Sequence, residues 1–571
     1  MRSPFLMLAL LLHVALAGSY AWFTPAFEGP DENSHYEYAW HVGNAGELPV
    51  TPSLAKERGL PQTGGAVLAH HPPLYYALLG AAMAMTGHDD TVFGPRVNPD
   101  FGVSGKESRH LHFLHEKEPN GVLFWLRSVS VLLGAITIVL VHRLGRVCCP
   151  DAPRVADLAA MLTACLPMFS FLHGLLNNDV LATTLATASM LALAKLQRSK
   201  RISTGGALGT GLLVGLALLT KLTTLFLLGT VGLVLLLACI GGRVRWLAAF
   251  AGGAATLGIA GWLFWHNYQL YGDPLAMAAH DASFQPLPKE LRWHYIFGTG
   301  PWPDSAPSFV PTVFTSLFGR FGWFSVEPHE ALTWAGAGVA ALSLLGLLAA
   351  PFERNQRHIP HPFWLLVLAC LLVLGGTLFF NLRAPQPQGR LLFCAIGPAA
   401  VLVAAGLTRL TRALPGRRIV LMLLPATAVA AFFITFWPAL QPGLAPAPTN
   451  HRTLVGGIVD AKGPESIAWQ CEFDAPIESL PRLAWDDIQA PEGMDYTLYA
   501  FGEDGRVYLA THEWSHGDVR ISGTNWTMPE ALWTFLPKGV PVSLRLRRLP
   551  QTAEERPEGL SFSPPLVVTR K

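Results

Sequence analysis

Long apolar segments recur along the first three quarters of the chain, separated by loops that carry most of the charged residues. A helix that crosses a bilayer needs about 20 mostly apolar residues, and segments of this kind predict about eleven spans. They are Phe5–Phe23, Val122–Val147, Val155–His173, Asp179–Leu196, Gly206–Leu219, Thr223–Ile240, Trp246–Tyr271, Ala331–Ala350, Pro362–Phe380, Leu391–Leu410 and Ile419–Trp437. The pattern therefore predicts an α-helical polytopic membrane protein, with its membrane domain over residues 1–438.

Composition supports the membrane class, because 51% of the 571 residues are hydrophobic and only 14% are charged. The mean hydropathy of +0.34 exceeds what a soluble domain of this length carries. The net charge of +2 says little about partners, and no pattern indicates nucleic-acid binding. Seven cysteines mostly lie inside or at the inner ends of the predicted helices and predict no disulfide framework: Cys148, Cys149, Cys165, Cys239, Cys370, Cys394 and Cys471.

Basic residues gather in alternate loops, and such loops stay in the cytoplasm. The groups are Arg143, Arg146 and Arg154; Lys195, Arg198, Lys200 and Arg201; Arg243 and Arg245; Arg354 and Arg357; Arg409, Arg412, Arg417 and Arg418. We therefore predict a cytoplasmic N-terminus and an extracytoplasmic C-terminus. The alternative for the first segment is a cleaved signal peptide ending near Ala15–Gly18, although its single basic residue, Arg2, favours an uncleaved helix.

Two long loops and a tail fall on the outer side. The first loop, about 24–121, contains a short apolar stretch after Pro72 and Pro73 that predicts an interfacial helix, and the second loop runs over about 272–328. The tail, 439–571, has short alternating strands and turn residues, which predict an extracytoplasmic β-sandwich. Three of its tryptophans are candidates for glycan binding and, more simply, for the core: Trp514, Trp526 and Trp533.

Ionisable residues at a membrane boundary are costly and tend to mark function. Asp31 and Glu32 follow the first span directly and lead the candidates for general acid/base chemistry. The simpler interpretation is that this pair caps the helix that follows Pro30, a common use of Asp. Other polar groups stand at the outward ends of separate spans and could converge with them on one cavity: Asn177-Asn178-Asp179, Lys221, His266-Asn267, Arg320 and Gln388-Gly389-Arg390.

As a set, these residues resemble the GT-C class of polyprenyl-phosphate-sugar-dependent glycosyltransferases, which includes protein O-mannosyltransferases and the aminoarabinose transferases of lipid A. The resemblance covers Phe5 to about Trp437 and is closest to a bacterial group of multi-pass proteins. Its matching elements are Pro30-Asp31-Glu32 with His35 and Tyr38, His71-Pro72-Pro73-Leu74-Tyr75-Tyr76, Asn178-Asp179, Gly215–Thr223, Tyr271–Pro274, Gly319–Trp323 and Gln388-Gly389-Arg390.

The resemblance implies roles for these residues. Asp31 corresponds to the family's catalytic base, with Glu32 beside it, and would take the proton of an acceptor hydroxyl as that hydroxyl attacks the sugar with inversion. Arg390 is the first candidate to stabilise the lipid-phosphate leaving group, followed by Lys221 and Arg320. The remaining expected substrate-binding residues are His35, Tyr38, His71, Tyr75, Asn178, Asp179 and Gln388.

The partners implied are a polyprenyl-phosphate-linked sugar, an extracytoplasmic acceptor (a lipid, a surface glycan or a protein) and membrane lipids. The location implied is the bacterial inner membrane. Two histidine groups, His70-His71 and His110–His115, are compatible with a metal, but no defined ligand set emerges and we predict no cofactor. Two other functions stay open: a transporter or flippase for a lipid-linked glycan, and a non-catalytic subunit that binds glycans through the tail.

Overall fold

A computed structural model describes residues 3–24, 27, 29–60, 65–85, 120–283, 287–299, 308–322, 326, 328–348 and 362–410, then 429–437 without 431, and parts of 467–571. The chain divides into two compact units. One comprises residues 1–24, 29–88 and 121–438, and the other 25–28, 89–120 and 439–571. We call them the membrane unit and the β unit.

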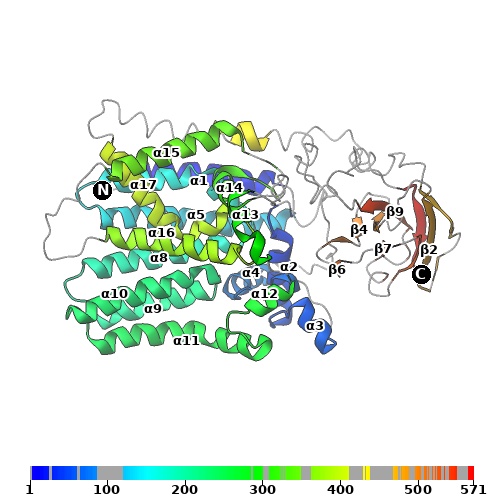
Figure 1. The fold of residues 1–571 in the computed structure, drawn as a ribbon, viewed down its shortest axis with the longest axis horizontal. Coiled ribbons are helices and arrows are strands. Elements are labelled where there is room, and N and C mark those ends of the chain that lie inside the picture. Colours follow the sequence, from blue (N-terminus) through cyan, green and yellow to red (C-terminus); the bar gives the residue numbers. More distant parts are fainter. Residues whose placement is uncertain are drawn as a thin grey trace. The chain divides into compact units, whose positions relative to one another are not determined.

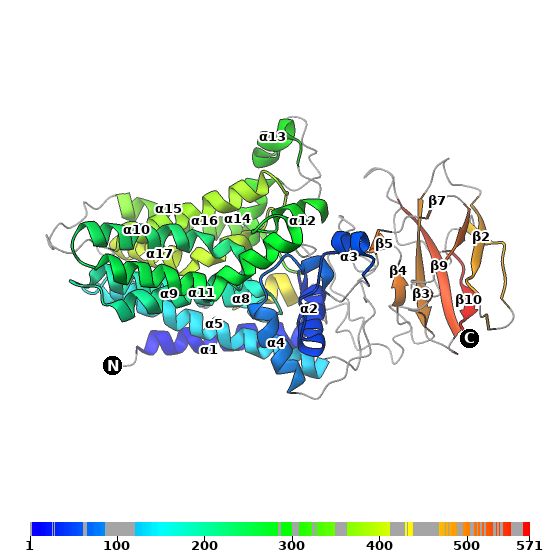
Figure 2. The ribbon, with the colours of Figure 1, turned by 90° about the horizontal axis from the view of Figure 1, so that it is seen from below.

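The membrane unit is a bundle of long apolar helices, and the protein is a multi-pass membrane protein. In the described part of the chain, eight helical segments are long and apolar enough to span a bilayer. They are α1 (Pro4–Phe23), α5 (Asn120–Cys148), α8 (Asn178–Arg198), η3 (Leu222–Leu225) with α10 (Phe226–Ile240), α11 (Trp246–Tyr271), α15 (Glu330–Leu348), α16 (Phe363–Asn381), and η5 (Gly389–Ala395) with α17 (Ile396–Leu410). Figures 1 and 2 show these helices running alongside one another.

One segment predicted as a single span is broken in the structure. The segment Val155–His173 forms α6 (Pro153–Ala164) and α7 (Pro167–Leu172), because Pro167 has no backbone N–H to continue the first helix. The segment Gly206–Leu219 forms one helix, α9 (Thr204–Leu218), whose 15 residues are fewer than the about 20 that a span needs. Most of the predicted last span, Ile419–Trp437, lies outside the described residues.

Short helices gather at the end of the bundle opposite the N-terminus (Figures 1 and 2). They are α2 (Glu32–Ala45), α3 (Pro52–Arg58), η1 (Ala66–Leu68), α4 (Leu74–Ala84) and α12 (Met277–Ser283). The predicted helix after Pro72 and Pro73 is α4, which begins at Leu74. Helices α2 and α4 pack closely, because Gly43 and Gly80 face each other: a Cβ built on Gly43 would lie 2.9 Å from the Gly80 carbonyl oxygen.

The segment 272–328 supplies three more helices: η4 (Lys289–Leu291), α13 (Arg292–Phe297) and α14 (Phe309–Gly319). A short π-helix, η7, covers Phe432–Phe436. Helix α14 packs against η5. Gly389 makes this contact possible, because a Cβ there would lie 2.7 Å from both the Val313 oxygen and the Leu317 nitrogen. The packing fixes the position of the residue that follows, Arg390.

The β unit contains antiparallel sheets around its own core. A three-stranded sheet has the order β1 (Ile467–Trp469), β2 (Arg482–Asp487), β8 (Asn525–Thr527). A five-stranded sheet has the order β10 (Leu566–Thr569), β9 (Pro541–Leu549), β3 (Asp495–Gly502), β4 (Val507–Ala510), with β7 (Ile521–Ser522) also paired to β3. A third pair joins β5 (His512–Glu513) to β6 (Gly517–Asp518).

Side chains of both larger sheets meet in one hydrophobic cluster that includes Trp485, Leu498 and Leu544. The β-rich nature of the tail is as predicted, while its stacking as a sandwich stays a prediction. Trp533 is buried in this cluster and Trp526 packs against it, as the simpler interpretation of these tryptophans expected. Trp514 lies outside the described residues.

Candidate functional site

Asp31 occupies the N-cap position of α2, yet its side chain makes no capping hydrogen bond. Its backbone is left-handed, with φ 61° and ψ 10°, a conformation that non-glycine residues seldom adopt. The carboxylate turns instead to Arg390, whose Nη2 donates to Asp31 Oδ2 at 2.5 Å. The side chain of Asp31 keeps 36% of its exposure while that of Arg390 keeps 7%, so the carboxylate is the accessible member of the pair.

The surroundings of Asp31 favour its ionised form. Burial by itself raises the pKa of this carboxyl, but Arg390, His35 and Lys221 and the hydrogen bond from Arg390 lower it, and the net pKa lies below its usual value. At neutral pH the group is therefore a carboxylate that is able to accept a proton.

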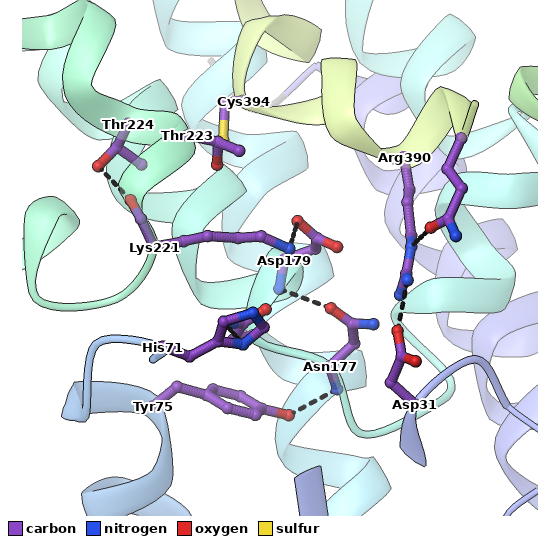
Figure 3. A network of polar contacts seen from close by, with 12 residues as sticks. Asp31, His71, Tyr75, Asn177, Asp179, Lys221, Thr223, Thr224, Arg390 and Cys394 are labelled. Atoms are coloured by element: carbon purple, nitrogen blue, oxygen red, sulfur yellow. Dashed lines mark hydrogen bonds and ion pairs between the residues drawn. The ribbon is translucent and has the colours of Figure 1, made fainter. Parts of the chain in front are cut away.

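Arg390 is held by its own segment, η5. Its Nε donates to Gln388 Oε1, and the backbone N–H of Gly389 donates to Ser316 Oγ of α14 at 2.8 Å. The guanidinium is thereby fixed from one side while it contacts Asp31 on another (Figure 3). A planar guanidinium held in this way is suited to binding phosphate oxygens.

The structure separates Glu32 from Asp31. Glu32 is fully buried and forms a bidentate ion pair with Arg127 of α5, with Nε–Oε1 at 2.8 Å and Nη2–Oε2 at 2.6 Å. The Leu176 N–H also donates to Glu32 Oε1, and Arg127 Nη1 donates to the carbonyls of Ala21 and Thr24. This cluster joins the end of α1, the start of α2, α5 and the segment before α8.

Asp179 and Lys221 form a third ion pair. Lys221 Nζ donates to Asp179 Oδ1 at 2.7 Å, and the two side chains are 13% and 4% exposed, respectively. Asp179 lies in the first turn of α8, whose N-cap Asn177 accepts a hydrogen bond from the Asp179 N–H at 2.8 Å. Figure 3 shows Asn177 between this pair and the Asp31–Arg390 pair.

Aromatic and histidine side chains of α2 and α4 line the same region. Tyr76 Oη lies 2.9 Å from His35 Nδ1 and 3.1 Å from His71 Nδ1, and the rings of Tyr38 and Tyr76 stack with centroids 3.8 Å apart. Burial lowers the pKa of His35 to about 3 and that of His71 well below its usual value. Both imidazoles are therefore neutral at physiological pH.

Two further contacts connect α4 and the residues just before it to the start of α8. The Asn177 N–H donates to Tyr75 Oη at 2.9 Å, and Asn178 Nδ2 lies 3.2 Å from His71 Nδ1. Tyr38 Oη donates to the His71 carbonyl. Elements far apart in the sequence thus meet through direct polar contacts.

Most of the predicted site residues come together in this cluster. Contacts join Asp31 to Arg390, Arg390 to Gln388, and Asp179 to Lys221. Tyr76 contacts His35, Tyr38 and His71, while Tyr75 contacts Asn177 and His71 contacts Asn178. Arg320 lies at the C-terminal end of α14, which packs on η5. Arg127 and Tyr76 were not among the predicted site residues, although Tyr76 belongs to one of the matching motifs. A lone arginine inside an apolar span was the available signal for Arg127.

A metal ligand set does not emerge where the structure describes the chain, since no group of three or more His, Cys, Asp or Glu residues there is placed to hold an ion. His70 and His71 are neighbours, with ring centroids 4.5 Å apart, and His70 also faces His280. The run His110–His115 lies outside the described residues.

Residues 120–265 match the sequence family described as dolichyl-phosphate-mannose-protein mannosyltransferase. This match bears out, over these residues, the predicted resemblance to the GT-C class of glycosyltransferases. No curated protein matches the chain in sequence.

Solved structures of two GT-C proteins are similar to the chain. ArnT from Cupriavidus metallidurans, bound to undecaprenyl phosphate, has 14% identity and a TM-score of 0.46, over 78% of this chain and 66% of that protein. The oligosaccharyltransferase of Archaeoglobus fulgidus has 16% identity and a TM-score of 0.42, over 75% and 54%. The chain therefore covers less than two thirds of the length of either protein.

Proposed function

We propose that this protein transfers a sugar from a polyprenyl-phosphate donor to an extracytoplasmic acceptor, with inversion at the anomeric carbon. The observation that carries the proposal is the Asp31–Arg390 pair. It presents an accessible carboxylate beside a buried guanidinium, within a cluster of otherwise buried polar groups. The description of the matched family, which names a lipid-phosphate-linked mannose, supports this choice of donor class.

Asp31 is the proposed general base. An acceptor hydroxyl is a poor nucleophile until a positioned carboxylate takes its proton during attack, and such catalysis contributes roughly 100-fold or more. The lowered pKa of Asp31 keeps it unprotonated, and its partial exposure leaves it open to an incoming hydroxyl. Its proximity to Arg390 places the base beside the group proposed to bind the donor.

Arg390 is the proposed contact for the lipid phosphate. Negative charge grows on this leaving group as the glycosidic bond breaks, and fixed donors in a poorly hydrated site stabilise it. Among the described residues, Arg390 Nη2 donates to Asp31 and Nε donates to Gln388, so the guanidinium retains N–H donors for a second anion. Lys221 and Arg320 are the next candidates in the same role.

We propose a role for Glu32 that differs from the general-base role of Asp31. Its carboxylate is engaged on both oxygens by Arg127, so we propose that it positions Asp31 rather than exchanging protons with substrate. Gln388 is proposed to orient Arg390, and His35, Tyr38, His71 and Tyr75 to form the wall of the substrate site. The site is proposed to face the outer side of a bacterial inner membrane, with a cytoplasmic N-terminus and an extracytoplasmic β unit.

Mass spectrometry of membrane lipids tests the proposal. Cells that lack the protein are complemented at equal expression with wild type, with Asp31→Asn, or with Glu47→Gln, an exposed carboxylate that follows α2. A polyprenyl-phosphate sugar is expected to accumulate in the null strain and with Asp31→Asn, and to be cleared by wild type and Glu47→Gln.

Two other results would contradict it. Clearance by Asp31→Asn at the wild-type rate would remove Asp31 as the base. No accumulation in the null strain would favour the transporter or the non-catalytic subunit over a transferase.

A further inference from the structure

Three consecutive residues at the start of α8 each present a buried polar atom that has no hydrogen-bond partner among the described residues. The atoms are Asn177 Nδ2, Asn178 Oδ1 and Asp179 Oδ2. The three residues are 1%, 0% and 3% exposed. A buried polar group left unpaired costs free energy, and native proteins keep few of them. Three in succession therefore indicate a place where a polar ligand binds.

The other polar atom of each side chain is already engaged, which fixes how the unpaired atoms are presented. Asn177 Oδ1 accepts from the Asp179 N–H at 2.8 Å. Asn178 Nδ2 lies 3.2 Å from His71 Nδ1, and Asp179 Oδ1 accepts from Lys221 Nζ at 2.7 Å. The side chains are thus held by the protein itself and offer one donor and two acceptors.

The chemistry of these atoms favours neutral ligand groups over charged ones. An anion would meet the carboxylate of Asp179, and the backbone N–H groups of Leu176, Asn177 and Asp179 already donate within the protein. A cation at Asp179 Oδ2 would lie close to Lys221, with like-charge repulsion. Neutral hydroxyl groups, which both donate and accept, satisfy all three atoms without either penalty.

We infer that the start of α8 binds the sugar of the donor, and that this sugar is a neutral one whose hydroxyls meet Asn177, Asn178 and Asp179. The inference rests on the proposed function and specifies its substrate. Asp179 interacts electrostatically with Arg390, and Figure 3 places Asn177 between the two ion pairs. The donor is thereby divided between two groups of residues: Arg390 binds the phosphate, and the start of α8 binds the ring.

Lipid binding to the purified full chain in nanodiscs tests this division. The probes are bare polyprenyl phosphate, its mannose, glucose and galactose derivatives, the monodeoxy forms of the sugar that binds best, and the 4-amino-4-deoxyarabinose derivative. We expect one neutral-sugar lipid to bind about tenfold or more tightly than bare polyprenyl phosphate, and individual deoxy forms to lose most of that gain. The deoxy probes need no variant protein, so they do not depend on whether a variant folds.

Variants separate the two parts of the site. Asn178→Leu is expected to abolish the preference for the glycosylated lipid and to leave the affinity for bare polyprenyl phosphate unchanged. Arg390→Gln is expected to weaken the binding of both lipids by the same factor. The inference is overturned if Asn178→Leu weakens the binding of both lipids equally, or if the aminoarabinose lipid binds best. If wild type binds none of these lipids, the proposed function itself fails.

Discussion

Asp31 holds a left-handed backbone conformation that costs a non-glycine residue of order 1 kcal/mol or more. Such strain persists only where surrounding contacts impose it. Two contacts impose it here. The side chain of Asp31 accepts a hydrogen bond from Arg390, and the side chain of the next residue, Glu32, is held by Arg127. Asp31 is thereby kept from capping α2 and is turned toward the cluster.

The pH dependence of Arg390→Gln tests the electrostatic link at this residue. In wild type the acid limb of kcat/KM, where Asp31 gains a proton and loses its capacity as a base, is expected below the usual pKa of an aspartate. Arg390 is the largest of the contributions that lower the pKa of Asp31, so its removal raises this pKa and moves the acid limb to higher pH. The rate is also expected to fall roughly 100-fold or more.

Arg390→Lys keeps the charge and is expected to keep the acid limb near its wild-type position. Arg245→Gln, at an exposed N-cap of α11, is the matched control for loss of one arginine. An acid limb that does not move in Arg390→Gln would show that Asp31 does not set it.

The sequence motifs predicted which residues belong to the site, but they did not predict which of these residues contact one another. The sequence indicated Asp31, Asp179, Lys221 and Arg390 as candidates, but nothing in it states that a residue near position 31 contacts one at 390. The partner of Glu32 was missed because Arg127 lies inside an apolar span, where hydropathy alone had defined the segment. Ionisable side chains within predicted spans are therefore candidates for the site in the same way as those in loops.

At the scale of the elements, the Glu32–Arg127 pair connects α1, α2, α5 and the segment before α8. Breaking a buried ion pair from one side costs about 3–5 kcal/mol, because the other charge is left unpaired. Arg127→Gln is expected to destabilise more than Glu32→Gln, since Arg127 also donates to the Ala21 and Thr24 carbonyls. Thermal unfolding in detergent measures both, and turnover is expected to fall more than affinity for the donor.

The double variant Glu32→Gln/Arg127→Gln distinguishes a pair from two separate contributions. It is expected to lose less stability than the sum of the single variants. Strict additivity would contradict the role assigned to the pair.

The α2–α4 contact depends on small residues. A Cβ on Gly80 would lie 2.6 Å from the Ala39 carbonyl oxygen, so Gly80→Ala is expected to destabilise by about 1–3 kcal/mol and to lower activity by shifting α2. Gly258→Ala in α11 is the matched control, because nothing lies within 4 Å of its added Cβ, and it is expected to be neutral or slightly stabilising. Thermal unfolding and turnover of both variants provide the comparison, and equal effects would rule out a specific role for this contact.

Spans were the most predictable elements, because their length and hydropathy are properties of each segment alone. The break before Pro167 was readable from the residue type, yet the surrounding apolar run concealed it. The 3₁₀ segments that precede α10 and α17 were not predictable, since they arise from contacts with other helices: η5 packs on α8, α14 and α16.

At the scale of the whole molecule, the two units have separate cores. Residues of the main membrane core fall between Val141 and Leu407, and those of the β-unit core between Leu483 and Val568. Units with cores of their own can fold independently. A chain that ends at Pro438 is therefore expected to keep its thermal stability and its binding of polyprenyl phosphate, measured as for the full chain; loss of either would show that the β unit completes the membrane unit.

The bond between Asp31 and Arg390 joins residues that are 359 positions apart. Ribosomes add about 5–20 residues each second, so Arg390 is synthesised on the order of tens of seconds after Asp31. During that interval the growing chain already contains α1 and α2 but lacks Arg390, which holds the Asp31 side chain in place. Premature termination before η5 would release a membrane-inserted fragment that lacks Arg390. The Asp31–Arg390 pair can therefore form only when translation of the membrane unit is nearly complete.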